Sequence, residues 1–170
     1  MNAVVAAGVS AANFSATVDS VWLDLSKGLG CPVGAVLSGS REFIHEAWRW
    51  KHRIGGAMRQ AGVVAAAGSW ALKHHVDRLA EDHENAQLLA KRISALDGVT
   101  LVNEKVETNM VFFDVSQTPL SAAEISARLR GKGIWIGAFG EQRMRAVTHL
   151  DVRREDIIET SDALADILVH

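Results

Sequence analysis

The feature that most restricts the fold is a lysine set in a glycine-rich turn between two apolar runs. The stretch LDLSKGLGCPVGAVL (residues 23–37) contains Lys27, three glycines and a proline. Val21, Leu23 and Leu25 occupy alternate positions, which predicts a strand over residues 18–25, and the run over residues 33–37 predicts a second strand. Lys27 continues the alternation, so we expect its side chain on the same side as Leu23 and Leu25, in a partly buried position.

The rest of the chain alternates between helical and strand patterns. Ser40 is a predicted N-cap for a helix that stops at Gly55–Gly56. The patterns predict helices over residues 41–54, 60–96, 121–130 and 154–169, and strands over 99–102, 109–115, 134–136 and 144–148. This order indicates an α/β or α+β fold class, with a domain change inside the helical stretch at residues 80–96.

Composition and charge exclude several classes of partner and compartment. The 170 residues are 48% apolar and 22% charged, and the formal net charge is 18 − 20 = −2. This balance gives no electrostatic reason to expect nucleic acid or an anionic membrane as a partner. The uncharged run at residues 2–17 is too polar and too short to span a membrane. The single cysteine, Cys31, has no partner for an internal disulfide, which indicates a cytoplasmic protein.

Two phosphate-loop motifs can be excluded around Lys27. A P-loop places its lysine after the glycines and before Ser or Thr, whereas Lys27 precedes them. The dinucleotide fingerprint requires G-x-G-x-x-G, and the spacing from Gly28 through Gly30 to Gly34 is one residue too long. A desolvated lysine, in contrast, provides a nucleophilic amine that can condense with a carbonyl. The alternative is a solvated turn lysine without a role.

Three blocks of sequence point to a known family. VDSVWLDLSKGLGCPVGAVLSGS, GGAMRQAGVVAAAG and MRAVTHLDV follow one another along the chain. Together they resemble the low-specificity L-threonine aldolase family, and the resemblance covers essentially the whole chain. It implies that Lys27 is the Schiff-base lysine that carries pyridoxal 5'-phosphate. The implied fold is part of an aminotransferase-like fold type I large domain at residues 1–80, followed by a small α+β carboxy-terminal domain at 81–170.

Two arginines are candidate substrate-binding residues. Arg143, Arg145 and Val147 would share one strand face, and a guanidinium there can hold an α-carboxylate in a bidentate pair. The R-x-V-T-H block of the resembling family matches at Arg145 and implies that role, although a positively charged edge strand is the alternative. Arg59 in GGAMRQ lies in the turn into a helix, and the resemblance implies a position at or beside the active site.

The histidines do not indicate a metal site. His74 and His75 are adjacent and point to different sides of a helix, and His45 and His52 lack the i, i+4 spacing of a zinc motif. We therefore predict that no metal is bound. The five tryptophans indicate core or subunit-interface packing rather than a platform for nucleic-acid bases.

The resemblance also implies what this stretch does not contain. In the family, the carboxylate that pairs with the pyridine nitrogen and the phosphate-binding loop precede the segment that begins here as MNAVVA. We therefore expect this chain to be the carboxy-terminal portion of an aldolase that acts on β-hydroxy-α-amino acids as a homodimer or homotetramer. The alternatives are another fold type I lyase or aminotransferase, and a catalytically silent packing module.

Overall fold

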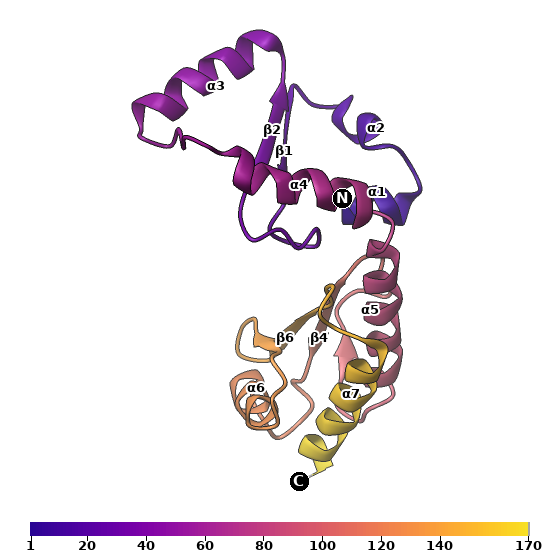
Figure 1. Ribbon diagram of the computed structural model, residues 1–170. Helices are drawn as coiled ribbons and strands as arrows, with labels where there is room; N and C mark the ends of the chain where they lie inside the picture. Colours follow the sequence, from indigo (N-terminus) through magenta and orange to yellow (C-terminus); the bar gives the residue numbers. More distant parts are fainter. Residues whose placement is uncertain (170) are drawn as a thin grey trace. The chain divides into compact units, whose positions relative to one another are not determined.

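The chain folds into two compact units. A computed structural model describes residues 1–169 (Figure 1). Unit 1 comprises Met1–Leu79, and unit 2 begins at Ala80. Each unit has its own buried hydrophobic cluster. Among residues 1–169, no helix is both long enough and apolar enough to cross a membrane.

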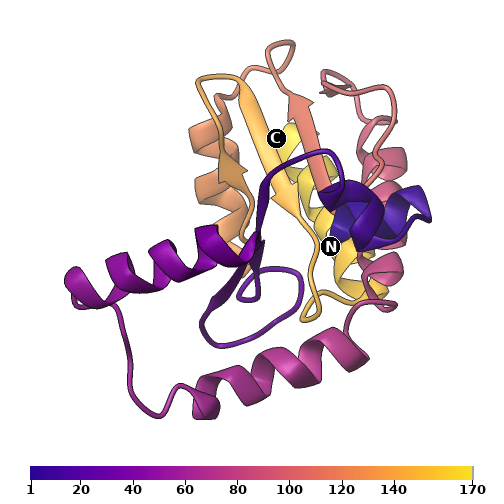
Figure 2. The same ribbon diagram turned by 90° about the horizontal axis from the view of Figure 1, so that it is seen from above.

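Unit 1 is an antiparallel strand pair with helices before and after it. Its elements are α1 (Asn2–Ala7), α2 (Ala11–Ser15), β1 (Ser20–Asp24), β2 (Ala35–Gly39), α3 (Arg41–Arg53) and α4 (Gly62–His74). The two strands pair from Ser20 opposite Gly39 to Asp24 opposite Ala35, so the ten residues between them form a closed loop that contains Lys27. The Ser40 side chain accepts from the Phe43 N–H, which confirms the predicted N-cap of α3. Figure 2 shows α3 and α4 as separate helices joined by an irregular segment.

The core of unit 1 is small. It consists of Leu25, Leu29, Cys31, Ala71 and Leu79, with a few half-buried neighbours. No residue of α3 is buried, and many large apolar side chains of the unit are exposed, including Trp22, Trp48 and Trp50. Exposed apolar surface of this extent is typical of a face that another polypeptide surface covers.

Unit 2 is a four-stranded antiparallel sheet with three long helices. Its elements are α5 (Leu79–Ile93, which begins at the last residue of unit 1), β3 (Thr100–Leu101), β4 (Met110–Asp114), α6 (Ala122–Gly131), β5 (Gly137–Ala138), β6 (Arg143–Val147) and α7 (Arg154–Val169). The strand order is β3-β4-β6-β5, and all neighbours are antiparallel. Helix α6 begins at a complete capping box made by Ser121 and Glu124.

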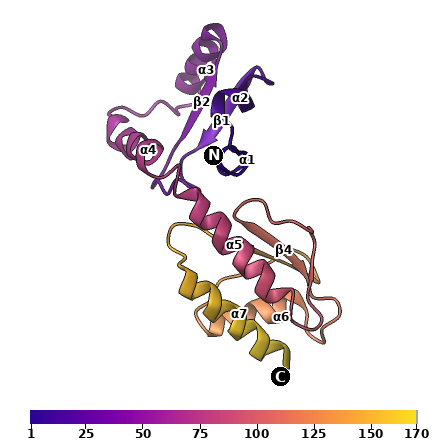
Figure 3. The same ribbon diagram turned by 90° about the vertical axis from the view of Figure 1, so that its right-hand side faces the viewer.

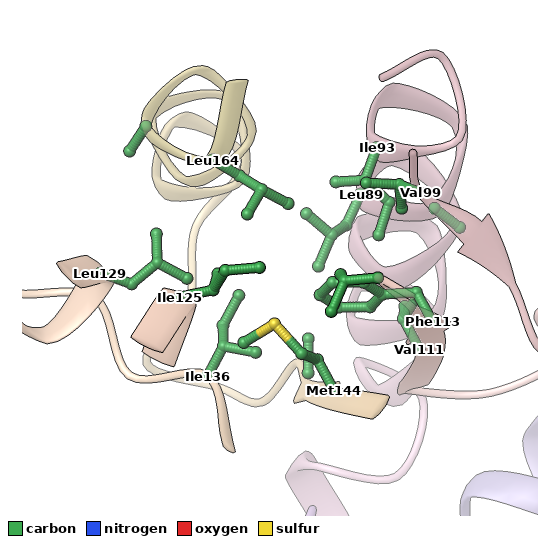
Figure 4. Close-up of a cluster of buried hydrophobic side chains, with 14 of the residues drawn as sticks. Leu89, Ile93, Val99, Val111, Phe113, Ile125, Leu129, Ile136, Met144 and Leu164 are labelled. Carbon is green, nitrogen blue, oxygen red and sulfur yellow. The ribbon is translucent and has the colours of Figure 1, made fainter. Parts of the chain in front are cut away.

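All three helices of unit 2 pack on one face of its sheet. Residues from α5, α6 and α7 form one cluster with Val111, Phe113, Met144 and Ala146 of the two central strands. Figure 3 shows the three helices beside the sheet, and Figure 4 shows side chains from helices and strands pointing toward one another. Burial in β6 alternates strictly, with Met144 and Ala146 inside and Arg143, Arg145 and Val147 outside, which confirms that these last three residues share one strand face.

Two predicted elements are wrong, one in its extent and one in its kind. The helix predicted over residues 60–96 is interrupted, since α4 ends at His74 and α5 begins at Leu79. The strand predicted over residues 134–136 is an irregular segment, and β5 follows it. The Ile134 N–H donates to the Leu129 carbonyl, and the Ser126 hydroxyl donates to the Ile136 carbonyl, so these backbone groups bond to α6 instead of to a neighbouring strand.

Candidate functional site

The loop that carries Lys27 is held closed by backbone hydrogen bonds. The Leu25 N–H donates to the Gly34 carbonyl at 3.0 Å, and the Cys31 N–H donates to the Leu25 carbonyl at 2.9 Å. Inside this frame, the Gly30 N–H donates to the Lys27 carbonyl at 2.8 Å and closes a tight turn over residues 27–30. Lys27 therefore occupies a fixed backbone position.

The glycines of the loop serve its own geometry and packing. Gly30 and Gly34 have φ angles of 71° and 122°, which side-chain-bearing residues rarely adopt. A Cβ on Gly28 would lie 3.0 Å from a Leu79 methyl carbon and 3.1 Å from the Asn2 side-chain nitrogen. Gly28 therefore lets the turn pack closely against α1 and the start of α5.

The side chain of Lys27 is exposed, which corrects the expectation of a partly buried position. The strand alternation ends at Leu25, which is buried, because β1 stops at Asp24 and the chain turns. The carboxylate of Asp24 accepts from the Ser26 N–H at 2.8 Å and starts the turn. Lys27 thus points an amine into solvent from a rigid loop within unit 1.

Arg145 lies on the uncovered face of the sheet in unit 2. It is opposite Phe112 on β4 and Gly137 on β5. Its guanidinium carbon lies 5.6 Å from the centroid of the Phe139 ring, and Phe139 in turn meets Phe112 edge to face at 5.6 Å. The two aromatic rings provide an apolar floor beside the guanidinium.

The guanidinium of Arg145 is available to an anion. Among the described residues it makes no ion pair, whereas Arg143 on the same face lies 3.9 Å from the Asp114 carboxylate. Hydrogen bonds from Ser116, chiefly from its side chain, hold the pKa of Asp114 below its usual value, so Asp114 is ionised at neutral pH and pairs with Arg143. The edge-strand interpretation of this segment is wrong, because β6 lies between β4 and β5.

Arg59 lies in unit 1, in the turn before α4, and its side chain is exposed. The next residue, Gln60, has a φ of 53°, which is unusual for a residue other than glycine. The structure therefore describes Lys27 and Arg59 within unit 1 and Arg145 within unit 2.

Sequence reasoning missed two features next to these candidates. The imidazole of His75 contacts the Leu29 carbonyl in the Lys27 turn at 2.8 Å, and Phe139 lies under Arg145. His75 is 46 positions from Leu29 in the sequence, and no spacing rule connects them. Phe112 lies opposite Arg145 on the neighbouring strand β4, a pairing that the pattern of either strand alone does not specify.

The described residues include an accessible amine that suits a carbonyl-bearing cofactor. No group of three or more His, Cys, Asp or Glu side chains among residues 1–169 could hold a metal ion. Lys27, in contrast, is an accessible amine on a loop whose backbone is fixed at both ends. Such an amine can bind a carbonyl-bearing cofactor covalently.

Comparison with known proteins identifies the family. The model of the family described as beta-eliminating lyase matches residues 1–117. The chain belongs to the beta-eliminating lyase family. A low-specificity L-threonine aldolase from Escherichia coli K12 is 41% identical over 160 residues, which are 94% of this chain and 46% of that protein. A low-specificity L-threonine aldolase 1 from Arabidopsis thaliana is 38% identical over 157 residues, 92% of this chain and 44% of that protein.

Solved structures confirm the predicted fold class. A protein from Listeria monocytogenes assigned as an L-allo-threonine aldolase superposes with a TM-score of 0.77 at 22% identity, over 96% of this chain and 48% of that one. The resemblance predicted from the three sequence blocks is therefore confirmed by relatives of that name. The chain spans about half the length of the curated relatives that it matches.

Proposed function

We propose that this chain carries the cofactor-binding lysine of a pyridoxal-phosphate enzyme that cleaves β-hydroxy-α-amino acids to glycine and an aldehyde. The observation that carries the proposal is the exposed Lys27 amine on its hydrogen-bonded turn, in a chain that belongs to the beta-eliminating lyase family. The names of two relatives that match more than nine-tenths of this chain support threonine as a substrate, and the name of the Listeria monocytogenes structure supports allo-threonine.

Lys27 is the residue that would hold pyridoxal 5'-phosphate. Its accessible amine and rigid loop suit a covalent link to the cofactor aldehyde. When bound, pyridoxal phosphate supplies an electron sink for the charge that develops at the substrate Cα. The exposed rather than desolvated position of Lys27 within unit 1 means that surfaces outside this unit would have to complete the dry part of such a site.

The arginines are proposed to bind the substrate. Arg145 offers two parallel N–H donors to the α-carboxylate, and the Phe112 and Phe139 rings exclude water from one side of the guanidinium. Arg59 would contribute a second cation from the turn before α4. Holding the carboxylate would fix the orientation of the substrate while the β-hydroxyl proton is removed.

The proposed reaction is balanced without a co-reactant. The Cα–Cβ bond breaks, the β-hydroxyl loses its proton, and Cα gains one, so glycine and the aldehyde together contain all the atoms of the substrate. The family description favours one alternative, β-elimination, which would give ammonia and a 2-oxo acid. A catalytically silent packing module would give neither set of products.

We also propose that the protein acts in the cytoplasm as a homodimer or homotetramer. The free, buried Cys31 suits a reducing compartment. The exposed tryptophans of unit 1, among them Trp48 and Trp50, suit a subunit interface.

Product analysis tests the proposed function. The purified chain is incubated with pyridoxal phosphate and L-threonine or L-allo-threonine, and glycine, acetaldehyde, ammonia and 2-oxobutanoate are quantified. Glycine and acetaldehyde in equal amounts, abolished in Lys27→Ala, support the aldolase. Ammonia with 2-oxobutanoate would support β-elimination, and no product above the Lys27→Ala background would favour the silent module.

A further inference from the structure

We propose that His75 is a positioning residue that fixes the turn presenting Lys27. The Nδ1 atom of His75 lies 2.8 Å from the backbone carbonyl oxygen of Leu29. A carbonyl oxygen only accepts hydrogen bonds, so Nδ1 carries the proton and donates it. His75 follows α4 directly, 48 positions after Lys27 in the sequence, and its bond joins the end of that helix to the lysine turn.

The bond acts on Lys27 through a single rigid peptide group. The Leu29 carbonyl and the Gly30 N–H belong to the same peptide unit, which is planar. The carbonyl accepts from His75. The N–H, which points in the opposite direction within the plane, donates to the Lys27 carbonyl at 2.8 Å. Fixing the direction of the carbonyl therefore fixes the direction of the N–H that closes the turn.

The sequence of the turn gives such a bond something to fix. Gly30 has a φ of 71°, and glycine adopts positive and negative φ about equally well, so its own backbone preference does not select this orientation. The Leu29 side chain is buried in the core of unit 1, which anchors the residue but leaves the rotation of the following peptide plane open. The His75 bond selects the orientation in which Gly30 faces Lys27.

The neighbouring histidine provides a matched control. His74 carries the same side chain as His75 and lies one residue earlier. Its ring is exposed and lies against the Trp70 ring at a centroid distance of 4.0 Å. His74 therefore lies close in sequence without reaching the lysine turn.

The test combines variants with a spectroscopic reading of the wild type. In His75→Asn the side-chain amide can still donate, whereas His75→Leu fills similar space without a donor. Amide hydrogen exchange of Gly30, followed by NMR, should accelerate about three- to tenfold in His75→Leu and remain near wild type in His75→Asn and His74→Leu. The rate of reductive labelling of Lys27 by pyridoxal phosphate and borohydride should also change in His75→Leu and remain near wild type in His75→Asn and His74→Leu. In the wild type, the ¹⁵N spectrum should show His75 protonated at Nδ1 at pH 8.

The outcomes separate this inference from the proposed function on which it rests. Unchanged Gly30 exchange in folded His75→Leu, or an Nδ1 without a proton in the wild type, would overturn the role of His75. Should His75→Leu fail to fold, the wild-type spectrum and the His75→Asn variant still decide. A wild type that shows the Gly30 protection and the Nδ1 proton but no preferential labelling of Lys27 would refute the cofactor proposal and leave the His75 contact intact.

Discussion

The packing of Gly68 against Leu25 gives a prediction whose sign can be worked out in advance. Gly68 is buried in the middle of α4, and a Cβ placed on it would lie 2.8 Å from a methyl carbon of Leu25. Since carbon atoms in contact normally lie about 3.5–4.0 Å apart, the methyl group would have to move by roughly 0.7 Å or more. Leu25 is in the core of unit 1 and two residues before Lys27.

Two effects of Gly68→Ala oppose each other. Replacing a mid-helix glycine by alanine stabilises a helix by about 0.8–1.0 kcal/mol. Overpacking a core position costs about 1–3 kcal/mol. We therefore expect the overpacking to prevail, with a net decrease in the free energy of unfolding of about 1 kcal/mol. In a Leu25→Ala background the obstructing methyl group is gone, and the same substitution should become stabilising.

Urea denaturation followed by tryptophan fluorescence is the suitable assay. Four of the five tryptophans, Trp22, Trp48, Trp50 and Trp70, belong to unit 1, so the signal reports mainly on that unit. Gly62→Ala at the start of the same helix is the control, because a Cβ there meets no atom within 4 Å. If Gly68→Ala raised the unfolding free energy as Gly62→Ala is expected to, the packing argument would be refuted.

Three further predictions concern unit 2. The buried Thr148 hydroxyl donates to the backbone carbonyl of Asp82 at 2.6 Å. Thr148→Val should therefore lower the free energy of unfolding by about 1–3 kcal/mol in a urea titration, whereas Thr100→Val at an exposed position should have little effect. Ser121→Ala removes the cap of α6 and should lower the free energy of unfolding by about 1 kcal/mol, whereas Ser121→Asp should retain most of it. Equal losses of stability for the two variants in thermal unfolding would contradict the capping role. His83→Gln should make the stability of the chain less sensitive to acid.

The sign of the His83 effect follows from its surroundings. Burial lowers the pKa of His83 below its ordinary value of 6.5, and the nearby Asp82 carboxylate offsets this only in part. Below pH 6.5 the unfolded chain therefore binds the proton more readily than the folded chain. The free energy of unfolding decreases as the pH is lowered, until the folded-state pKa is reached. Unfolding measured at pH 7.5 and 5.5 should show a smaller loss in His83→Gln than in the wild type. An equal loss in both would mean that His83 does not contribute.

The sequence predicted those elements whose signals are local. The helix over residues 154–169 has the predicted bounds, and Ser40 caps its helix as its position before the apolar periodicity indicates. The strand face that Arg145 shares with Arg143 and Val147 follows from alternation alone. In each case the determining residues are neighbours along the chain.

The features that escaped prediction depend on contacts between distant residues. The interruption between α4 and α5 carries no glycine or proline; it coincides with the bond from His75 to the lysine turn and with burial of Leu79 in the core of unit 1. The exposure of Lys27 depends on where β1 ends, which alternation of apolar residues cannot specify. Alternation likewise suggested a strand at Ile134–Ile136, where the backbone bonds to α6 instead.

Reductive trapping at Lys27 tests the central claim most directly. The chain is mixed with pyridoxal phosphate, reduced with borohydride and digested, and the modified lysines are mapped by mass spectrometry. The chain has five other lysines (Lys51, Lys73, Lys91, Lys105 and Lys132), which serve as internal controls, and Lys27→Arg keeps the charge without the reactive amine. Our account predicts that the pyridoxyl group is found predominantly on Lys27 and that labelling in Lys27→Arg falls to the level of the other lysines. Labelling spread evenly over all six lysines would contradict it.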